Sequence, residues 1–243
     1  RYLSGVVRGD LGPSFQYTDF SVNELILQGL PVSMKVGASA LLLALLLGGL
    51  AGIYAAVRQN RFADHAVMTL ARTGMSIPVF VIAPLLILLF AVSLGWLPAG
   101  GWQSGGVSDL VLPVAALALP QIAVIARLTR GSMIEVLSSN YIRTARAKGL
   151  RMPTVILRHA LRPAMTPVIS YLGPAAAGII TGSVVIEQIF GIPGIGRYFV
   201  QAALNRDYTL VMGVVIFYGV LIILFNFVVD LLYGILDPRV RAA

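Results

Sequence analysis

Residues 36–57 read VGASALLLALLLGGLAGIYAAV, which is 22 residues without a charged side chain. At 1.5 Å per residue, an α-helix of this length measures roughly 30 Å, enough to cross the hydrocarbon layer of a bilayer. A helix is the only sensible assignment, because an open strand would leave backbone polar groups unpaired in lipid. This stretch therefore predicts a transmembrane helix.

Four more apolar runs follow the first one along the chain. They cover residues 74–96, 110–126, 164–186 and 208–229. The run 110–126 is the shortest, and it is interrupted by Pro113 and Pro120. We therefore predict an all-α, polytopic membrane helical bundle with five transmembrane helices in this chain.

The composition supports a membrane protein. Apolar residues make up 58% of the 243 residues, charged residues only 12%, and the mean hydropathy is +0.87. A soluble domain carries about a quarter charged residues. The net charge of +8 comes from basic residues in the connections between runs, so it indicates membrane topology rather than nucleic-acid binding. The absence of cysteine excludes disulfides and a thiol nucleophile.

The charges of the connections predict the orientation. Basic residues gather in residues 58–73, 127–163 and 237–243, whereas residues 97–109 contain no Lys or Arg. Cytoplasmic connections carry the excess of Lys and Arg, which places the three basic segments inside and residues 1–35 outside. An outside N-terminal segment without a signal peptide leads us to expect one earlier span before Arg1.

Residues suited to catalysis or ion coupling are scarce. His65 and His159 have no nearby acidic or histidine partners, and no P-loop pattern is present. Glu187 and Asp230 lie at the ends of runs, where a charge is expected to reach water. The sequence therefore predicts no enzyme, no metal and no cofactor bound by this chain. It also disfavours an ion-coupled secondary transporter, which needs a mid-membrane ion site and usually an internal repeat.

Some polar and small residues inside the runs point to helix packing. Gln121 and Asn226 are the strongly polar side chains deep in a run, and helix–helix hydrogen bonding is favoured over substrate contact. The pairs Gly48/Gly52 and Gly178/Gly182 each place two glycines on one helix face. They allow close helix packing, either within this chain or against a second transmembrane subunit.

The basic segment between the third and fourth runs has its own pattern. Ala145 and Gly149 lie one turn apart, and Arg143 and Arg146 share a neighbouring face. Gly149 suits the end of a helix, and the proline at 153 suits the start of a second one. We predict a helix–turn–helix projection into the cytoplasm that contacts a partner. The alternative is a basic loop that only fixes the topology.

Short motifs along the whole chain resemble one family. They are GDLGPS (9–14), YIRTARAKG (141–149), RHALRP (158–163), GP (173–174), TGSVVIE (181–187), FGIPGIG (190–196), NRDY (205–208) and DPR (237–239). These motifs are similar to those of the permease subunits of bacterial ABC importers for oligopeptides, dipeptides and nickel, most of all the B-type oligopeptide subunits. Against the general importer signature E-A-A-x₃-G-x₉-I-x-L-P, aligned on Gly149, only Ala145, Gly149 and Leu161 match outright.

The resemblance implies a type I importer permease fold with six spans, of which the first is missing here. Residues 1–35 would be a periplasmic segment, and residues 36–243 the permease domain with a cytoplasmic coupling loop at 127–163. In the family this loop docks on ATP-binding subunits. The residues implied in that coupling are Arg143, Ala145, Arg146, Lys148, Gly149, Leu150, Val155, His159 and Leu161.

The resemblance also implies the partners. They are a second, homologous permease subunit, two ATP-binding subunits that carry ATP and Mg, an extracytoplasmic solute-binding protein and the lipid bilayer, with no nucleic acid. The residues expected to face the binding protein are Gly191, Pro193, Gly194, Gly196, Asn205 and Asp207. The implied function is ATP-driven peptide import across the bacterial inner membrane, for oligopeptides first, with dipeptides, nickel or glutathione as alternatives. The N-terminal segment would be periplasmic and the C-terminus cytoplasmic.

Overall fold

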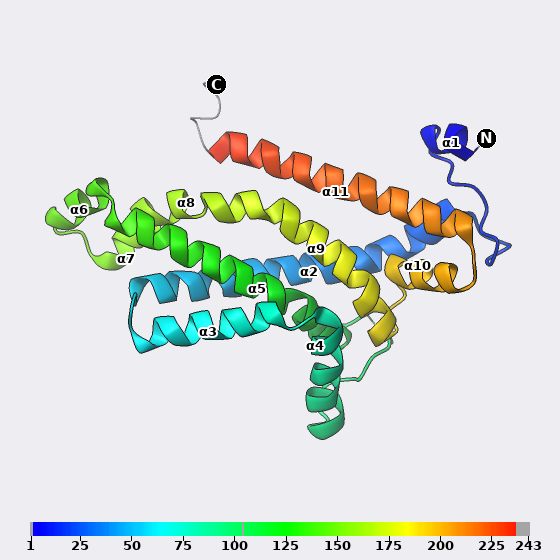
Figure 1. The fold of residues 1–243 in the computed structure, drawn as a ribbon, viewed down its shortest axis with the longest axis horizontal. Helices are drawn as coiled ribbons and strands as arrows, with labels where there is room; N and C mark the ends of the chain where they lie inside the picture. The colour runs from blue at the N-terminus through cyan, green and yellow to red at the C-terminus, as the bar shows by residue number, and fades with distance from the viewer. Residues whose placement is uncertain (1, 104, 237–243) are drawn as a thin grey trace. The chain divides into compact units, whose positions relative to one another are not determined.

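The computed structural model describes residues 2–103 and 105–236, and this part of the chain is almost entirely helical (Figure 1). It contains no β-strand, only an isolated bridge between Pro13 and Ser21. The helices are α1 (Tyr2–Val7), α2 (Val22–Val57), α3 (Phe62–Ser76), α4 (Val79–Leu86), the π-helix η1 (Ile87–Ser93), α5 (Val107–Ser138), α6 (Asn140–Ala147), α7 (Met152–Thr154), the π-helix η2 (Val155–Ala160), α8 (Leu161–Ala164), α9 (Thr166–Phe190), α10 (Ile195–Leu204) and α11 (Tyr208–Leu236).

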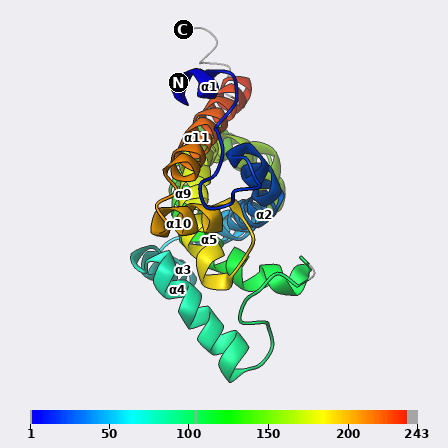
Figure 2. The same ribbon diagram turned by 90° about the vertical axis from the view of Figure 1, so that its right-hand side faces the viewer.

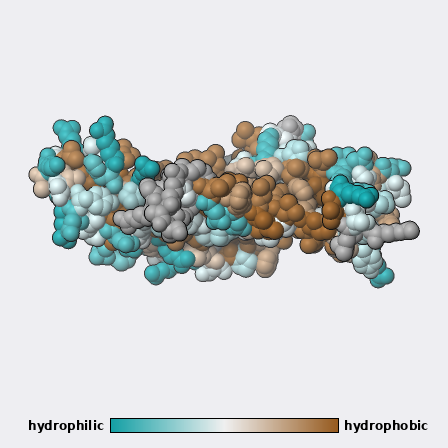
Figure 3. Space-filling model, turned by 90° about the horizontal axis from the view of Figure 1, so that it is seen from above, coloured by the Kyte–Doolittle hydropathy of each residue, from teal (hydrophilic) through white to brown (hydrophobic). Residues whose placement is uncertain are grey.

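The predicted all-α membrane fold is confirmed. Four described helices, α2, α5, α9 and α11, are long and apolar enough to cross a membrane, and the pair formed by α3 with α4 and η1 makes a fifth when counted as one span. Helix α11 has many exposed apolar side chains, among them Met212, Val215 and Ile223. Hydrophobic side chains at the surface are brown in Figure 3. Such a surface requires lipid or another apolar surface around it.

Helix α2 begins well before the predicted run. Ser21 and Glu24 form a capping box, in which the Ser21 N–H and hydroxyl donate to Glu24 Oε2 and the Glu24 N–H donates to Ser21 Oγ. The charge of Lys35 does not interrupt the helix, because its ammonium donates to the Gly105 carbonyl and lies 5.6 Å from the centre of the Trp102 ring. The apolar run therefore marks only part of the helix.

The second predicted run is interrupted by a proline. Helix α3 ends at Ser76, Ile77 is extended with φ −94° and ψ 121°, and Pro78 precedes α4. A proline disfavours the helical conformation in the residue before it and has no N–H to donate. Residues 74–96 thus cover the end of α3, then α4 and η1, rather than forming one helix.

The chain divides into two compact units, and α2, α5, α9 and α11 each contribute residues to both. Unit 1 comprises residues 1–40, 78–117 and 176–224. Its core joins the first turns of α2 to α10 and to the start of α11 through buried apolar residues, such as Val22, Ile195 and Leu210. Figure 2 shows α10 beside α2 and the end of α9. Helix α10 was not predicted from the sequence.

Unit 2 comprises residues 41–77, 118–175 and 225–243. In it α2 packs tightly on α5, because a Cβ added at Gly52 would lie 2.6 Å from the Ala126 carbonyl oxygen and one at Gly48 would lie 2.8 Å from that of Ile122. The intrachain role expected for this glycine pair is therefore confirmed. The Tyr171 hydroxyl of α9 donates to Gln121 Oε1 of α5 over 2.9 Å, which is the expected helix–helix hydrogen bond.

Asn226 of α11 also lies against a glycine in unit 2. A Cβ added at Gly173 of α9 would lie 2.2 Å from Asn226 Oδ1, so the glycine leaves room for the amide. The absence of a side chain at this position therefore lets the two helices approach closely.

Candidate coupling site

The segment after α5 forms the predicted helix–turn–helix. Helix α6 ends in a left-handed turn, with Gly149 at φ +81°. The Leu150 N–H donates to the Ala145 carbonyl and the Gly149 N–H to the Arg146 carbonyl, which together make a Schellman motif. Helix α7 then begins at Met152, with a proline in its first turn. The prediction that Gly149 ends one helix and that a second starts nearby is confirmed.

This projection is supported from within unit 2. Ile142 and Ala145 of α6 pack with Val155 and Ala160 of η2 and with Met133 of α5 in one buried cluster, to which Ala56 and Ala164 also belong. Figure 1 shows α6 and α7 beside the end of α5. The projection is therefore a packed structure, held by its own apolar cluster.

The nine predicted coupling residues divide into three groups by their exposure. Ala145 and Val155 are 8% and 0% exposed, so they stabilise the projection itself and offer no contact surface. His159 and Leu161 are partly buried. The exposed side chains that can meet a partner are those of Arg143, Arg146, Lys148 and Leu150, together with the open backbone at Gly149.

The exposed face of the projection is strongly basic. Residues 139–163 contain no acidic side chain. Among the described residues, none of the exposed cations Arg143, Arg146 and Lys148 forms an ion pair. The apolar cluster and the glycine turn thus stabilise the projection. Its positive charges remain free to interact with a partner molecule.

The predicted binding-protein-facing residues lie in unit 1, around α10. Gly191 and Asn205 are exposed and Pro193 is partly buried, whereas Gly194, Gly196 and Asp207 are buried. A Cβ added at Gly196 would lie 2.4 Å from the Cα of Val184, and one at Gly194 would lie 2.2 Å from Glu187 Oε2. These two glycines are therefore required by packing inside the chain.

Glu187 is the residue whose prediction was wrong. It was expected to reach water at a span end, but the structure buries it completely at 0% exposure. Its Oε2 accepts the Gly196 N–H over 2.8 Å, while Ser33 Oγ accepts the Ile195 N–H over 2.9 Å. Because the first turn of α10 folds over the end of α9, the carboxyl group of Glu187 holds that turn through a hydrogen bond instead of facing solvent.

Asp207 holds the N-terminal segment to the start of α11. Its Oδ2 accepts the Ser14 hydroxyl over 2.6 Å and the N–H groups of Phe15 and Gln16 over 3.0 Å, and its Oδ1 accepts the Leu210 N–H over 3.1 Å. Burial raises the pKa of this carboxyl, but the hydrogen bonds outweigh it, so the pKa lies below its ordinary value. Asp207 is thus an ionised N-cap and a clamp.

Across residues 2–103 and 105–236, no group of three or more His, Asp or Glu side chains is placed to hold a metal ion. The motif at 237–239 lies outside the described residues. The two features considered as contact sites for partner proteins are the exposed basic projection of unit 2 and the surface around α10 in unit 1, whose turns are held by hydrogen bonds to Glu187 and Asp207.

Comparison with known proteins identifies the class of this membrane protein. Residues 48–242 match the family model "Binding-protein-dependent transport system inner membrane component". The chain belongs to this family of ABC importer permeases. It is a transport subunit and not an enzyme, and its relatives are named as permease proteins of transport systems.

Individual relatives and structures agree with the family. The chain is 59% identical, over 99% of its length and 78% of the relative, to the oligopeptide transport system permease protein OppB of Escherichia coli strain K12. It is 50% identical, over 99% of its length and 77% of the relative, to the dipeptide transport system permease protein DppB of Bacillus subtilis. The inward-facing MetNI methionine ABC transporter matches the fold with a TM-score of 0.71 at 17% identity, over 88% of this chain and 96% of that one.

Proposed function

We propose that this chain is one of two transmembrane subunits of an ATP-driven importer that moves oligopeptides across the bacterial inner membrane. The 59% identity to an oligopeptide permease over nearly the whole chain supports the substrate class. Two ATP-binding subunits, with their ATP and Mg, supply the energy, and an extracytoplasmic binding protein delivers the peptide. Residues 1–35 lie on the periplasmic side and the C-terminus in the cytoplasm, in agreement with the distribution of basic residues.

The observation that carries the coupling proposal is the packed projection with an unpaired basic face. Closure of the ATP-binding subunits would pull on α6 and α7, and the cluster around Ile142 and Val155 would transmit this force to α5. Arg143, Arg146 and Lys148 would pair with acidic groups on the partner, and Leu150 would add an apolar contact. Ala145 and Val155 act from inside, by keeping the projection rigid.

On the periplasmic side of the membrane, the binding protein would contact the exposed residues around α10. Gly191 and Asn205 are the exposed members of the predicted set, while Gly194, Gly196 and Asp207 shape the surface from beneath. Leu204, which is 76% exposed at the end of α10, adds an apolar side chain to this surface. Because α10 is already held in place by hydrogen bonds and packing, binding of the partner would cost little conformational entropy at this surface.

Two substitutions at Gly149 test the coupling. Valine strains the left-handed backbone, whereas asparagine tolerates it, and open space surrounds a Cβ at this position. If Gly149 closely approaches an ATP-binding subunit, the Gly149→Asn protein should insert into the membrane normally but take up peptide about tenfold more slowly. A tenfold decrease corresponds to losing roughly 1.4 kcal/mol at this contact. Gly149→Val should lower it further.

The measurement is peptide uptake and ATP hydrolysis by the complete importer in liposomes, with the binding protein present. Unchanged uptake with Gly149→Asn would show that Gly149 only makes the turn. Concentrative uptake by the two transmembrane subunits without the ATP-binding subunits would overturn the proposed function itself. The dipeptide alternative, which the 50% identity to a dipeptide permease supports, is separated by competition between peptides of different length.

A further inference from the structure

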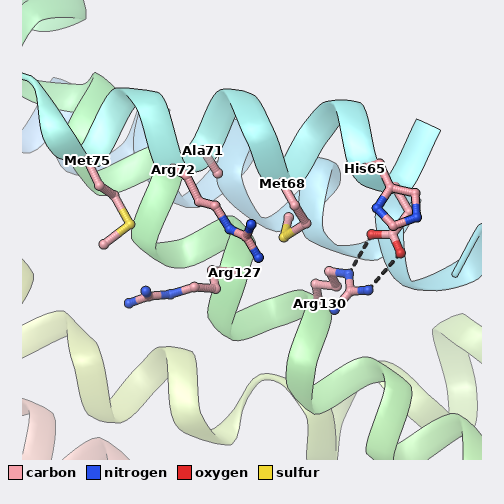
Figure 4. Close-up of a pocket in the computed structure, with 8 residues that line it drawn as sticks. His65, Met68, Ala71, Arg72, Met75, Arg127 and Arg130 are labelled. Carbon is pink, nitrogen blue, oxygen red and sulfur yellow. Dashed lines mark hydrogen bonds and ion pairs between the residues drawn. The ribbon is translucent and has the colours of Figure 1, made fainter. Parts of the chain in front are cut away.

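A basic pocket in unit 2, distinct from the projection, is not explained by coupling. It lies between α3 and α5 and has a volume of about 200 Å³. Arg72 of α3 and Arg127 of α5 line it, together with Met68 and Met75 (Figure 4). Two cations and two flexible apolar side chains thus share one small cavity.

One ion pair closes the end of this pocket and leaves its other charges uncompensated. The Arg130 guanidinium donates from Nε to Asp64 Oδ1 over 2.5 Å and from Nη2 to Asp64 Oδ2 over 2.6 Å. Asp64 is 1% exposed, and its Oδ2 also accepts the Asn60 N–H. This carboxylate is therefore fully engaged. Among the described residues, no acidic side chain pairs with Arg72 or Arg127.

The position of these two arginines in the sequence places them at the edge of the membrane. Arg72 is the last charged residue before the uncharged run 74–96, and Arg127 is the first one after the uncharged run 110–126. Charged side chains that flank apolar spans lie at the level of the lipid headgroups. Both arginines are exposed, so neither is screened by the protein from what lies beside the pocket.

The side chains fit a phosphate diester with an acyl chain attached. Two guanidinium groups provide fork-shaped donors for phosphate oxygens, which is the geometry that arginine supplies better than lysine. Met68 and Met75 provide adaptable apolar walls, and the nearby Leu70 is 73% exposed. Basic pockets between membrane helices on the cytoplasmic side are known to accept anionic lipid headgroups.

We propose that the pocket between α3 and α5 binds the phosphate group of an anionic phospholipid, with Arg72 and Arg127 as its ligands. The acyl chains would run along the apolar side chains beside Met75. The bound lipid compensates the two charges that the protein leaves unpaired. This site does not depend on the proposed substrate, because none of its residues lies in the helix–turn–helix at 139–163 or in the surface around α10.

The test is native mass spectrometry of the intact importer, purified in detergent and supplied with phosphatidylglycerol or phosphatidylcholine. The wild type should retain phosphatidylglycerol in preference to phosphatidylcholine. Arg72→Gln combined with Arg127→Gln should weaken this retention roughly tenfold or more, because the double variant loses both charged hydrogen-bond donors to the phosphate. Arg61→Gln is the matched control, because Arg61 is exposed at the start of α3 and does not line the pocket.

Three results would overturn the proposal. Equal retention of phosphatidylglycerol by the wild type and the double variant would show that these arginines do not hold the lipid. An equal loss of phosphatidylglycerol retention in Arg61→Gln would show that the effect comes from the general positive charge of the surface and not from this pocket. Displacement of the lipid by millimolar inorganic phosphate, with no preference for either lipid, would assign the pocket to a free anion. Peptide-stimulated ATP hydrolysis of the double variant checks that the importer is still assembled.

Discussion

The turns around α10 and the projection at α6 and α7 are stabilised in opposite ways. Around α10, the buried carboxyl groups of Glu187 and Asp207 accept backbone N–H groups and hold the chain from inside. In the projection, an apolar cluster around Ile142 and Val155 supplies the rigidity. The carboxyl groups of the first region are hydrogen-bonded within the fold, whereas the cations of the second region remain exposed. The cations of the projection are not needed to stabilise the fold, so they are available to bind a partner.

The largest loss of stability is expected at Gly196, where the first turn of α10 leaves no space for a side chain. In Gly196→Val, the new Cβ would lie 2.4 Å from the Val184 Cα and 3.0 Å from Glu187 Oε2. Because backbone must move, we expect a loss of about 3 kcal/mol or more, visible as a lower thermal midpoint or as loss of folded protein. Thermal unfolding of the purified importer provides the measurement.

Gly191→Asn provides the matched control for this substitution. Gly191 has φ +65°, is exposed, and a Cβ there would have only the Gly101 nitrogen at 4.0 Å. Asparagine tolerates this backbone conformation, so the midpoint should change little. A similar loss in both variants would mean that the whole turn, and not the contact of Gly196 with α9, sets the stability.

A smaller effect is expected from the protonation of Asp207. Its pKa is lowered in the folded protein, so its ionised form contributes stability that is complete above the unfolded value of about 3.9 and is lost as the pH falls through the folded pKa. The thermal midpoint of the wild type should therefore decrease below about pH 4. Asp207→Asn should start from a lower midpoint and lose less over the same range. Parallel pH curves for the two proteins would contradict the clamp.

The sequence predicted the helices better than it predicted their ends. Uncharged runs identify α2, α5, α9 and α11 because burial in lipid demands long apolar segments. They underestimate α2, since Lys35 is tolerated inside the helix by contacts with residues far along the chain. The signal that marks the true start, the Ser21–Glu24 capping box, is present in the sequence. The break at Pro78 likewise follows from local chemistry.

The candidate sites were predictable only where the signal is local. Gly149 and the following proline are close in sequence, and the turn they predict is the turn observed. The burial of Glu187 had no such signal, because it depends on Ser33 of α2 and on the first turn of α10. Helix α10 itself was hidden by the glycine-rich stretch before it, although Ile195, Phe199 and Ala202 have the spacing of one apolar helix face.

The smallest effect on stability, and a large one on coupling, is expected from the projection's charges. Replacing Arg143, Arg146 and Lys148 together by glutamine removes no ion pair within the described residues and leaves the cluster around Ile142 intact. The thermal midpoint of the isolated transmembrane pair should therefore change by the equivalent of about 0.5 kcal/mol or less. The variant should bind the ATP-binding subunits more weakly than the wild type does. Added salt should weaken binding more in the wild type than in the variant, because the wild type retains the charges that salt screens.

A titration of the ATP-binding subunits against the liposome-embedded pair, at two salt concentrations, separates the possible roles of these charges. Weaker binding with unchanged folding means that the cations serve the partner. A lower midpoint with unchanged binding would mean that they serve the fold, as Glu187 and Asp207 do in unit 1. Ile142→Ala should show the converse behaviour, because Ile142 is fully buried: a loss of about 2–5 kcal/mol in stability, with no change in the salt dependence of binding.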